Sequence, residues 1–308
     1  MRSTFFIVFL FCIIAVVSAQ QEAMYSQYMF NMLNVNPAYA GNRAVNNVTA
    51  LHRSQWVGFE GSPMTTTISW DVRRDQTNVG YGLQLYNDQL GIEKTTGFQG
   101  FYSYRLPFEN SSLAFGLSLG VLNFSADYSK VSTINPGDPA FAENENSWLP
   151  SAGFGMLYSA ENWYVGLSVP ALLKTKKYYS AEYAKNQTVG ANNHYFLNGG
   201  YIFDVNRTLK LKPSVLFKYV LGAPLQVDLN MNAWVNNMIG FGVSYRTNDA
   251  IVGMAELQIT PHLRVGYAYD HTLTQLNNYN YGSHEIMLRY EFDLSKEKVL
   301  KTLSPRYY

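Results

Sequence analysis

The sequence predicts an all-β fold, namely a transmembrane outer-membrane β-barrel of about fourteen antiparallel strands with a short N-terminal periplasmic or lumen segment. Three observations predict it. From residue 48 onward, polar and apolar residues alternate in runs of about ten, separated by turn residues. Charged residues make up only 15% of the chain, and aromatic residues make up as much. The connections between the runs are short at one end of the predicted barrel and long at the other.

Residues 1–19 have the pattern of a secretory signal. Arg2 supplies the positive end, Phe5 to Val17 form the apolar core, and Val17-Ser18-Ala19 is a small-residue cleavage site. The apolar core is shorter than the ~20 residues that a membrane-spanning helix needs, so we expect cleavage before Gln20. Cys12 is the only cysteine and lies in this segment, so the mature chain has no disulfide and no thiolate metal site.

The net charge of the chain implies no strongly charged partner. Loss of residues 1–19 removes one arginine and no acid, which takes the formal net charge from +1 to 0. A neutral chain with few charges predicts neither nucleic acid nor an acidic surface as a partner. Low charge with many tyrosines and glycines is instead typical of a barrel that contacts outer-membrane lipid.

The alternating runs define the barrel, which we expect to span residues 48–293. Fourteen strands are predicted at 48–56, 63–73, 77–87, 96–106, 112–124, 150–160, 162–169, 194–203, 207–219, 224–234, 238–246, 250–259, 262–271 and 283–293. Charged and amide residues on the polar face belong in the lumen, because a lipid-facing charge costs about 2–4 kcal/mol near the membrane midplane. This lumen set is Arg105, Lys210, Lys212, Lys218, Asp228, Arg246, Glu256, Gln258 and Arg264.

The lengths of the connections separate a membrane barrel from a soluble sandwich. Connections after even-numbered strands are all short, at 74–76, 107–111, 161, 204–206, 235–237 and 260–261. The long ones follow odd-numbered strands, at 125–149, 170–193 and 272–282. A sandwich has no reason to sort its loops in this way, whereas outer-membrane barrels have short periplasmic turns and long extracellular loops. An even strand number then places both termini in the periplasm.

No catalytic, cofactor-binding or metal-binding residues are predicted. The five histidines share no metal-binding spacing, and no nucleophile elbow or phosphate loop is present. Alternating glycines such as Gly153 and Gly155 are interpreted as ordinary packing of the barrel wall. The one enzymatic alternative is a catalytic group assembled in the lumen from distant strands, which would leave no local motif.

Two terminal segments do not have the strand pattern. In residues 20–47, Asn36 precedes Pro37 and is therefore expected to be extended, and Ala40-Gly41 permits a tight bend. Residues 294–308 form a basic tail with a net charge of +3, from Lys296, Lys298, Lys301 and Arg306 against Glu297. We expect this tail to be periplasmic, either as a frayed terminus or as a docking tail.

Three sets of residues carry a resemblance to a known family. The first set is Tyr25, Gln27, Tyr28, Asn31, Asn36, Pro37, Ala38, Tyr39 and Gly41. The second is Arg53, Gln55 and Trp56, followed by Pro63 and Thr65, and the third is Pro305, Arg306 and Tyr307. In this order they resemble the PorP/SprF family of Bacteroidetes outer-membrane proteins, over the chain from Gln20 to Tyr308. We take these residues as candidates for partner contacts.

The resemblance implies a function that the composition does not. Members of this family are barrels of the type IX secretion system and of gliding motility, and they associate with its periplasmic and lipoprotein subunits. They support export or surface attachment of proteins with a C-terminal sorting domain, such as gliding adhesins. The alternatives are a passive porin, a channel for hydrophobic solutes, or a purely structural barrel. Residues 20–47 either plug the lumen or dock a partner.

Overall fold

The computed structural model of the protein describes residues 24–43, 45–73, 77–130, 144–173, 176–177, 189–190 and 193–292. The predicted signal (1–19) and the predicted tail (294–308) lie outside these residues. Within them, long strands form one large sheet and the N-terminal residues form three short 3-10 turns. No helix in this part of the chain is long and apolar enough to cross a membrane.

Fourteen strands of the described residues form the wall of a barrel, which confirms the predicted fold class. They are β1 (Asn46–Ser54), β2 (Met64–Arg73), β3 (Val79–Leu90), β4 (Glu93–Pro107), β5 (Ser111–Ala126), β6 (Glu145–Ala160), β7 (Trp163–Val169), β10 (His194–Tyr201), β12 (Leu209–Val220), β13 (Gln226–Val235), β14 (Ile239–Arg246), β15 (Ala250–Gln258), β16 (Leu263–Thr272) and β17 (Ser283–Phe292). The short β11 (Phe203–Asp204) also pairs with β12, while β8 (Lys176–Lys177) and β9 (Val189–Gly190) pair with each other. A short 3-10 turn, η5 (Tyr128–Lys130), follows β5, and η7 (Gln275–Asn278) precedes β17.

The sheet closes on itself. Each strand pairs antiparallel with its neighbours, β10 pairs with β12, and the ring is completed by β1 and β17, where Asn46 lies opposite Phe292. Closure leaves no long edge of unpaired backbone groups, which a hydrocarbon environment would not tolerate.

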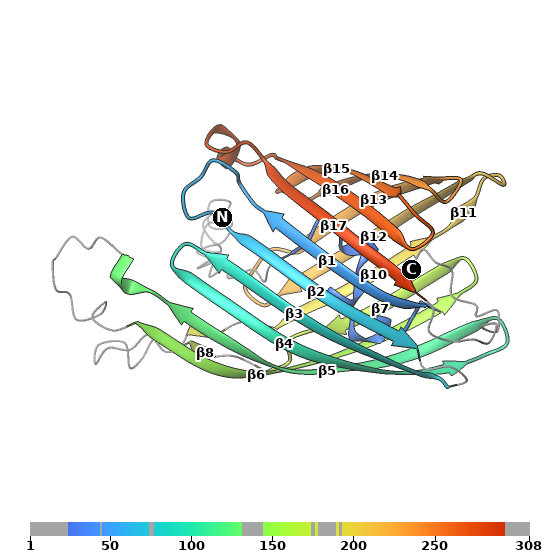
Figure 1. Cartoon of the computed structure of the whole chain (residues 1–308), viewed down its shortest axis with the longest axis horizontal. Helices are drawn as coiled ribbons and strands as arrows, with labels where there is room; N and C mark the ends of the chain where they lie inside the picture. Colours follow the sequence, from blue (N-terminus) through green and yellow to red (C-terminus); the bar gives the residue numbers. More distant parts are fainter. Residues whose placement is uncertain are drawn as a thin grey trace, which may run out of the picture.

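The two rims of the barrel differ, as the connection lengths predicted. One rim, here called the short-turn rim, holds the connections 108–110, 161–162, 236–238 and 259–262, and β1 begins and β17 ends there. The opposite rim, the long-loop rim, holds the connections 127–144, 170–193 and 273–282. Strands β5 and β6 project beyond the other wall strands at the long-loop rim (Figure 1).

Alternation along each strand separates the lumen from the outside. On β2, Thr65, Thr67 and Ser69 are buried toward the lumen, whereas Met64 and Ile68 face outward and are 43% and 49% exposed. Most of the predicted lumen set is buried, which confirms its placement: Arg105, Lys212, Lys218, Asp228, Arg246, Glu256 and Arg264. Lys210 and Gln258 lie at the short-turn rim and are partly exposed.

The outer face carries an apolar belt with tyrosines near both of its edges. Leucine, valine and isoleucine side chains form the middle of the belt, among them Leu85, Leu119, Leu167, Leu229, Val243 and Ile286. Outward tyrosines lie toward the short-turn rim (Tyr81, Tyr104, Tyr201, Tyr290) and toward the long-loop rim (Tyr195, Tyr219, Tyr245). Such a belt is stable against lipid tails with its phenols at the two headgroup layers.

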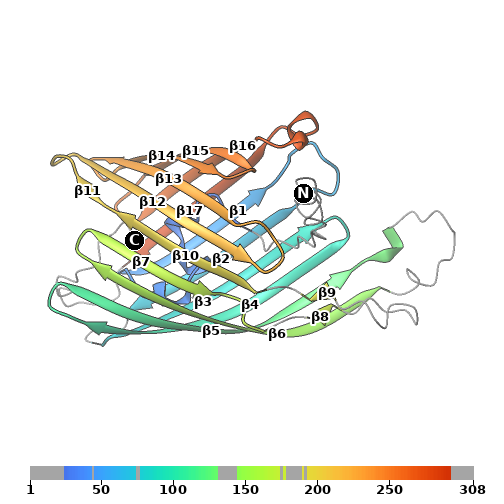
Figure 2. The same cartoon turned by 180° about the vertical axis from the view of Figure 1, so that it is seen from behind.

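The hydrophobic core lies inside the barrel. Residues 24–43, here called the lumen segment, run within the wall as 3-10 turns η2 (Tyr28–Phe30), η3 (Met32–Asn34) and η4 (Pro37–Tyr39) (Figures 1 and 2). Every residue from Tyr25 to Arg43 except Asn34 is buried. Their apolar side chains form one cluster with wall residues such as Leu157, Leu216, Trp234 and Met287.

Candidate functional site

The N-terminal end of the lumen segment is held by two carboxylates of the wall. Glu285 on β17 accepts the backbone N–H of Ser26 at 2.7 Å and that of Gln27 at 2.8 Å. Asp270 on β16 accepts the Ser26 hydroxyl at 2.6 Å. N–H groups that precede a helical turn have no acceptor within it, so the start of η2 offers donors that an acidic side chain can satisfy.

Arg53 on β1 forms ion pairs with both carboxylates. Its Nη1 donates to Ser26 Oγ at 2.7 Å and to Glu285 at 3.1 Å, and its Nη2 donates to Asp270 at 2.8 Å. Arg53 is 1% exposed, Asp270 2% and Glu285 0%. Buried charges persist only when paired and hydrogen-bonded, and here one guanidinium joins three wall strands to the lumen segment.

This ion pairing extends along the wall toward β12. Arg246 lies 3.6 Å from Asp270 and 3.4 Å from Asp228, and Lys218 Nζ donates to Asp228 at 2.9 Å. We call this set the long-loop network, because its members lie in the half of the lumen next to the long-loop rim: Arg53, Lys218, Asp228, Arg246, Asp270 and Glu285. Arg246 also pairs with the half-buried Asp249 at 3.1 Å. With Asp249 the network contains three cations and four carboxylates, so it has no excess of positive charge.

Two tyrosines of the segment reach the wall from the same end. The Tyr25 hydroxyl is hydrogen-bonded to Thr67, and the Tyr28 hydroxyl accepts from Asn230 Nδ2 at 2.7 Å. Burial raises the pKa of both phenols well above the ordinary value of tyrosine. Both therefore stay neutral, and each satisfies a polar group of the wall in a water-poor environment.

Asn36 is the central polar anchor of the segment. It is extended (φ −146°, ψ 116°), as the following proline requires, and its Oδ1 accepts the Ala38 N–H at 2.9 Å, which caps η4. Its Nδ2 donates to the carbonyls of Met156 at 3.0 Å and Leu167 at 3.4 Å. The amide of one fully buried side chain thus caps a turn and bonds β6 and β7 at once.

Glycines of four wall strands make room for residues 36–40. A Cβ added to Gly116 on β5 would lie 2.1 Å from the Ala38 nitrogen, and one on Gly155 of β6 would lie 2.0 Å from Asn36 Oδ1. Gly80 on β3 approaches the Ala40 carbonyl in the same way, and Gly166 on β7 approaches Asn36 Nδ2. The absence of side chains at these four positions therefore makes room for the lumen segment. Packing between wall residues alone does not explain these glycines.

The C-terminal end of the segment turns at Gly41 and meets the short-turn half of the wall. Gly41 has φ +60°, and a Cβ there would lie 2.6 Å from the Val72 carbonyl oxygen, so glycine is required. Its N–H donates to Asp71 at 3.2 Å. Two arginines bind the next residue, since Arg105 donates to Asn42 Oδ1 at 2.5 Å and Arg73 to the Asn42 carbonyl at 3.2 Å.

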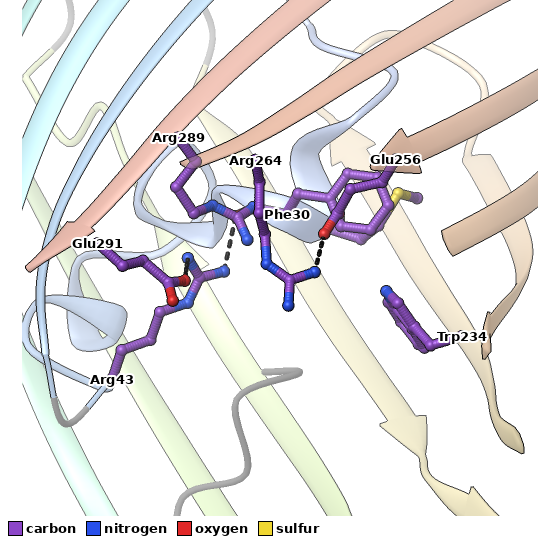
Figure 3. Close-up of a pocket in the computed structure, with 8 residues that line it drawn as sticks. Phe30, Arg43, Trp234, Glu256, Arg264, Arg289 and Glu291 are labelled. Atoms are coloured by element: carbon purple, nitrogen blue, oxygen red, sulfur yellow. Dashed lines mark hydrogen bonds and ion pairs between the residues drawn. The ribbon is translucent and has the colours of Figure 1, made fainter. Parts of the chain in front are cut away.

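A second group of charges surrounds the Phe30 carbonyl. That oxygen accepts from Arg43 at 2.8 Å and from Arg289 at 2.5 Å. Glu291 lies 3.8 Å from Arg43, and Arg264 donates to Glu256 at 2.5 Å (Figure 3). The Phe30 ring packs edge-on against Trp234 with 6.3 Å between the ring centroids. Together these residues line a small pocket in the short-turn half of the lumen.

The structure brings most of the predicted site residues together. In the lumen, with their side chains or backbone bound to one another or to the wall, lie Tyr25, Gln27, Tyr28, Asn31, Asn36, Pro37, Ala38, Tyr39, Gly41, Arg53 and Thr65. Gln55, Trp56 and Pro63 lie apart from them, in the β1–β2 connection at the long-loop rim. Pro305, Arg306 and Tyr307 lie outside the described residues.

Several residues of this site were not predicted. They are Arg43, Asp71, Asp270, Glu285, Arg289 and Glu291, with the glycines Gly80, Gly116, Gly155 and Gly166. The alternation that places Arg105 and Asp228 in the lumen applies equally to the charged wall residues, so the signal was present. No sequence signal distinguishes a wall glycine that contacts the lumen segment from one that contacts only neighbouring wall residues.

The part of the chain that the structure describes contains no cluster of three or more His, Cys, Asp or Glu side chains suited to a metal ion. The buried carboxylates are already bound by arginines, a lysine and backbone N–H groups. What the arrangement can do chemically is hold the lumen segment in place.

Comparison with known proteins identifies the family. Residues 17–290 match the family described as type IX secretion system membrane protein PorP/SprF. The chain belongs to the PorP/SprF family. It is therefore a membrane component of type IX secretion, and no curated protein sequence matches it significantly.

Solved structures show which fold the PorP/SprF chain shares. The Ralstonia pickettii toluene transporter TbuX superposes with a TM-score of 0.51 at 9% identity, over 87% of this chain and 93% of that one. The Acinetobacter baumannii outer membrane protein Omp33 gives 0.48 at 11%, covering 82% of this chain and 100% of that one. A Pseudomonas aeruginosa FadL homologue gives 0.47 at 12%, over 87% and 94%. The likeness to TbuX supports the outer-membrane barrel fold and, at this identity, nothing further.

The orientation of the barrel stays a prediction. The lumen segment runs from Tyr25 and Ser26, bound in the long-loop half, to Arg43 in the short-turn half. The predicted periplasmic N-terminus, Gln20, precedes the described residues, and the predicted C-terminal tail follows them.

Proposed function

We propose that this protein is a non-enzymatic accessory of type IX secretion that supports export or surface attachment of a cell-surface protein, such as a gliding adhesin with a C-terminal sorting domain. The lumen segment acts as a plug that closes the barrel. The long loops meet the secreted protein outside the cell. The short turns and the C-terminal tail meet periplasmic and lipoprotein subunits of the secretion apparatus.

One observation carries the proposal. The lumen segment bonds or closely contacts eleven of the wall strands, namely β1–β7, β10, β13, β16 and β17. A segment with so many buried bonds is part of the folded barrel, and it occupies the space that a solute would need. This favours an accessory with a closed lumen over a passive porin.

Conductance tests the closed lumen directly. In Gly116→Val, the new side chain collides with the Ala38 backbone, so the plug should leave its seat and the barrel should conduct ions in a planar bilayer. The wild type should be nearly silent. Gly100→Val on β4 is the matched control, because a Cβ there meets nothing closer than 3.9 Å. Equal conductance in the wild type and in Gly116→Val would favour the porin or solute-channel alternative.

Secretion tests the accessory role. Deletion of residues 21–41 should leave a surface protein trapped inside the cell, which immunoblots of cell and surface fractions would detect. Secretion and surface attachment that continue unchanged would contradict a role for the plug. The wild-type gene supplied on a plasmid is the control for the deletion strain.

The orientation is tested by single cysteines, because Cys12 is the only natural one. Glu60→Cys at the long-loop rim should react with a membrane-impermeant maleimide in intact cells. Asn110→Cys, at an exposed position of the short-turn rim, should react only after lysis. Labelling of Asn110→Cys in intact cells would reverse the proposed orientation.

A further inference from the structure

Positive charge is in excess in the short-turn half of the lumen. Among the described residues, the buried or half-buried charged side chains there, apart from Lys210, which pairs with Asp204, are six basic ones (Arg43, Arg73, Arg105, Lys212, Arg264, Arg289) and three carboxylates (Asp71, Glu256, Glu291). We call them the short-turn cluster. The cluster therefore contains three more basic than acidic side chains. An uncompensated buried charge is costly, so this half of the lumen favours an added anion.

Like-charge repulsion acts within the cluster. Arg105 is repelled by Arg73. Arg289 is repelled by Arg43 and Arg264 and attracted by Glu256 and Glu291. Arg73 and Arg105 donate to neutral oxygens of Gly41 and Asn42. Those bonds satisfy the donors without cancelling the charge, so the electrostatic excess remains.

Two of these arginines keep an unsatisfied donor beside the pocket. Arg43 Nη1 and Arg289 Nε are buried and make no hydrogen bond, and the 3.8 Å from Arg43 to Glu291 is an ion pair too long for one. Arg43 is 9% exposed and Arg289 is 3% exposed. Both line the pocket of Figure 3, whose free volume of about 10 Å³ has room for one water-sized group.

The chemistry of the lining selects a carboxylate. A carboxylate oxygen is an acceptor of that size, and guanidinium donors bind it with charge-assisted hydrogen bonds. Met29, Phe30 and Trp234 form the apolar side of the pocket. The remaining positive charge of Arg73 and Arg105, around Asn42, suits further acidic residues of the same peptide.

We propose that the short-turn cluster is a docking site for an acidic peptide segment of a partner protein, which inserts a carboxylate between Arg43 and Arg289. The proposal deepens the proposed function, because it names the chemistry by which a partner engages the plugged barrel. The chain's own tail is the wrong occupant, since residues 294–308 carry a net charge of +3.

The test is a binding assay with the purified full-length protein in nanodiscs of zwitterionic lipid. The probe is fluorescein-labelled hexaglutamate, followed by fluorescence anisotropy. We expect saturable binding that weakens as salt rises, and no binding of labelled hexalysine. Equal binding of both peptides, or none of hexaglutamate, would overturn the proposal.

Two variants move the affinity in opposite directions. Arg43→Gln removes a charged donor and should weaken binding about tenfold or more, whereas Glu291→Gln removes a competing carboxylate and should tighten it several-fold. Glu291→Gln keeps both bonds to the Phe30 carbonyl, so it tests the site even if Arg43→Gln loosens the plug. Lys94→Gln, at the exposed long-loop end of β4, is the matched control and should bind as the wild type does.

Two further outcomes would overturn the proposal. One is unchanged affinity in both Arg43→Gln and Glu291→Gln. The other is loss of binding when Lys296, Lys298 and Lys301 are all changed to Gln, since the probe would then bind the tail. The assay needs neither secretion nor conductance, so its failure is distinguishable from failure of the proposed function.

Discussion

The two halves of the lumen hold the same segment by different electrostatics. In the long-loop half, Arg53 lies between Asp270 and Glu285, and the network around them has no excess of cations. In the short-turn half, Arg43 and Arg289 share the neutral Phe30 carbonyl, and the cluster around them has an excess of cations.

This difference in charge indicates different roles: the long-loop network fixes the lumen segment, whereas the short-turn cluster can still bind an anion. Every carboxylate of the long-loop network has a cation or an N–H donor within hydrogen-bond distance, so an added charge would disturb it. The short-turn cluster becomes better compensated when an anion arrives. We infer that the first half fixes the plug and that the second half responds to a partner.

The largest expected loss of folding stability is at Arg53. Arg53→Met leaves Asp270 and Glu285 as neighbouring buried carboxylates without their shared cation, which should cost about 3–5 kcal/mol. Urea unfolding of the protein refolded in lipid vesicles would measure the loss. Arg53→Lys keeps the charge without the two-pronged geometry and should lose less. If Arg53→Met lowers the free energy of unfolding by less than about 1 kcal/mol, the long-loop network does not fix the lumen segment.

Asn36 tests the middle of the segment, between the two halves. Asn36→Asp replaces the donor to Met156 and Leu167 with an acceptor, so we expect a loss of about 1–3 kcal/mol in the same assay.

Asn34 offers a matched control for that change. Its Oδ1 accepts a hydrogen bond from Gln84, while its Nδ2 makes none. Asn34→Asp therefore keeps the bond from Gln84 and should lower stability less than Asn36→Asp does. Equal losses in the two variants would show that the added charge alone decides the result.

The smallest expected effect is at Arg105. Arg105→Gln loses part of a bond to Asn42 but also removes repulsion from Arg73, so stability should change by less than about 1 kcal/mol. Unfolding measured beside Arg53→Met tests the contrast between the two halves. A loss as large as that of Arg53→Met would contradict the excess of positive charge.

Much of the barrel was predictable because its signals are local. Side chains in a strand alternate between two faces, and a charge cannot face lipid cheaply, so alternation alone assigned residues such as Asp228 and Arg246 to the lumen. The connection lengths predicted the two rims. Asn36 and Gly41 took the extended and left-handed conformations that the Asn-Pro and Ala-Gly pairs require.

The candidate site was predictable only in part. The motif residues Tyr28, Asn36 and Tyr39 stood out, but their partners Asn230, Met156 and Asn198 lie at least 120 residues away in sequence. The register of the closed sheet decides which wall residue contacts which residue of the lumen segment. The sequence of a single strand does not determine that register.

The sequence by itself determined a closed antiparallel barrel, its two unlike rims and an N-terminal segment that is not a strand, since each depends on periodicity and turn chemistry within short stretches. Only the tertiary structure decided that this segment fills the lumen, that Gly116 and Gly155 receive it, and that cations are in excess at one end and not at the other. These features depend on closing the sheet, which brings β1 beside β17 and sets side chains far apart in the chain across a lumen of fixed width.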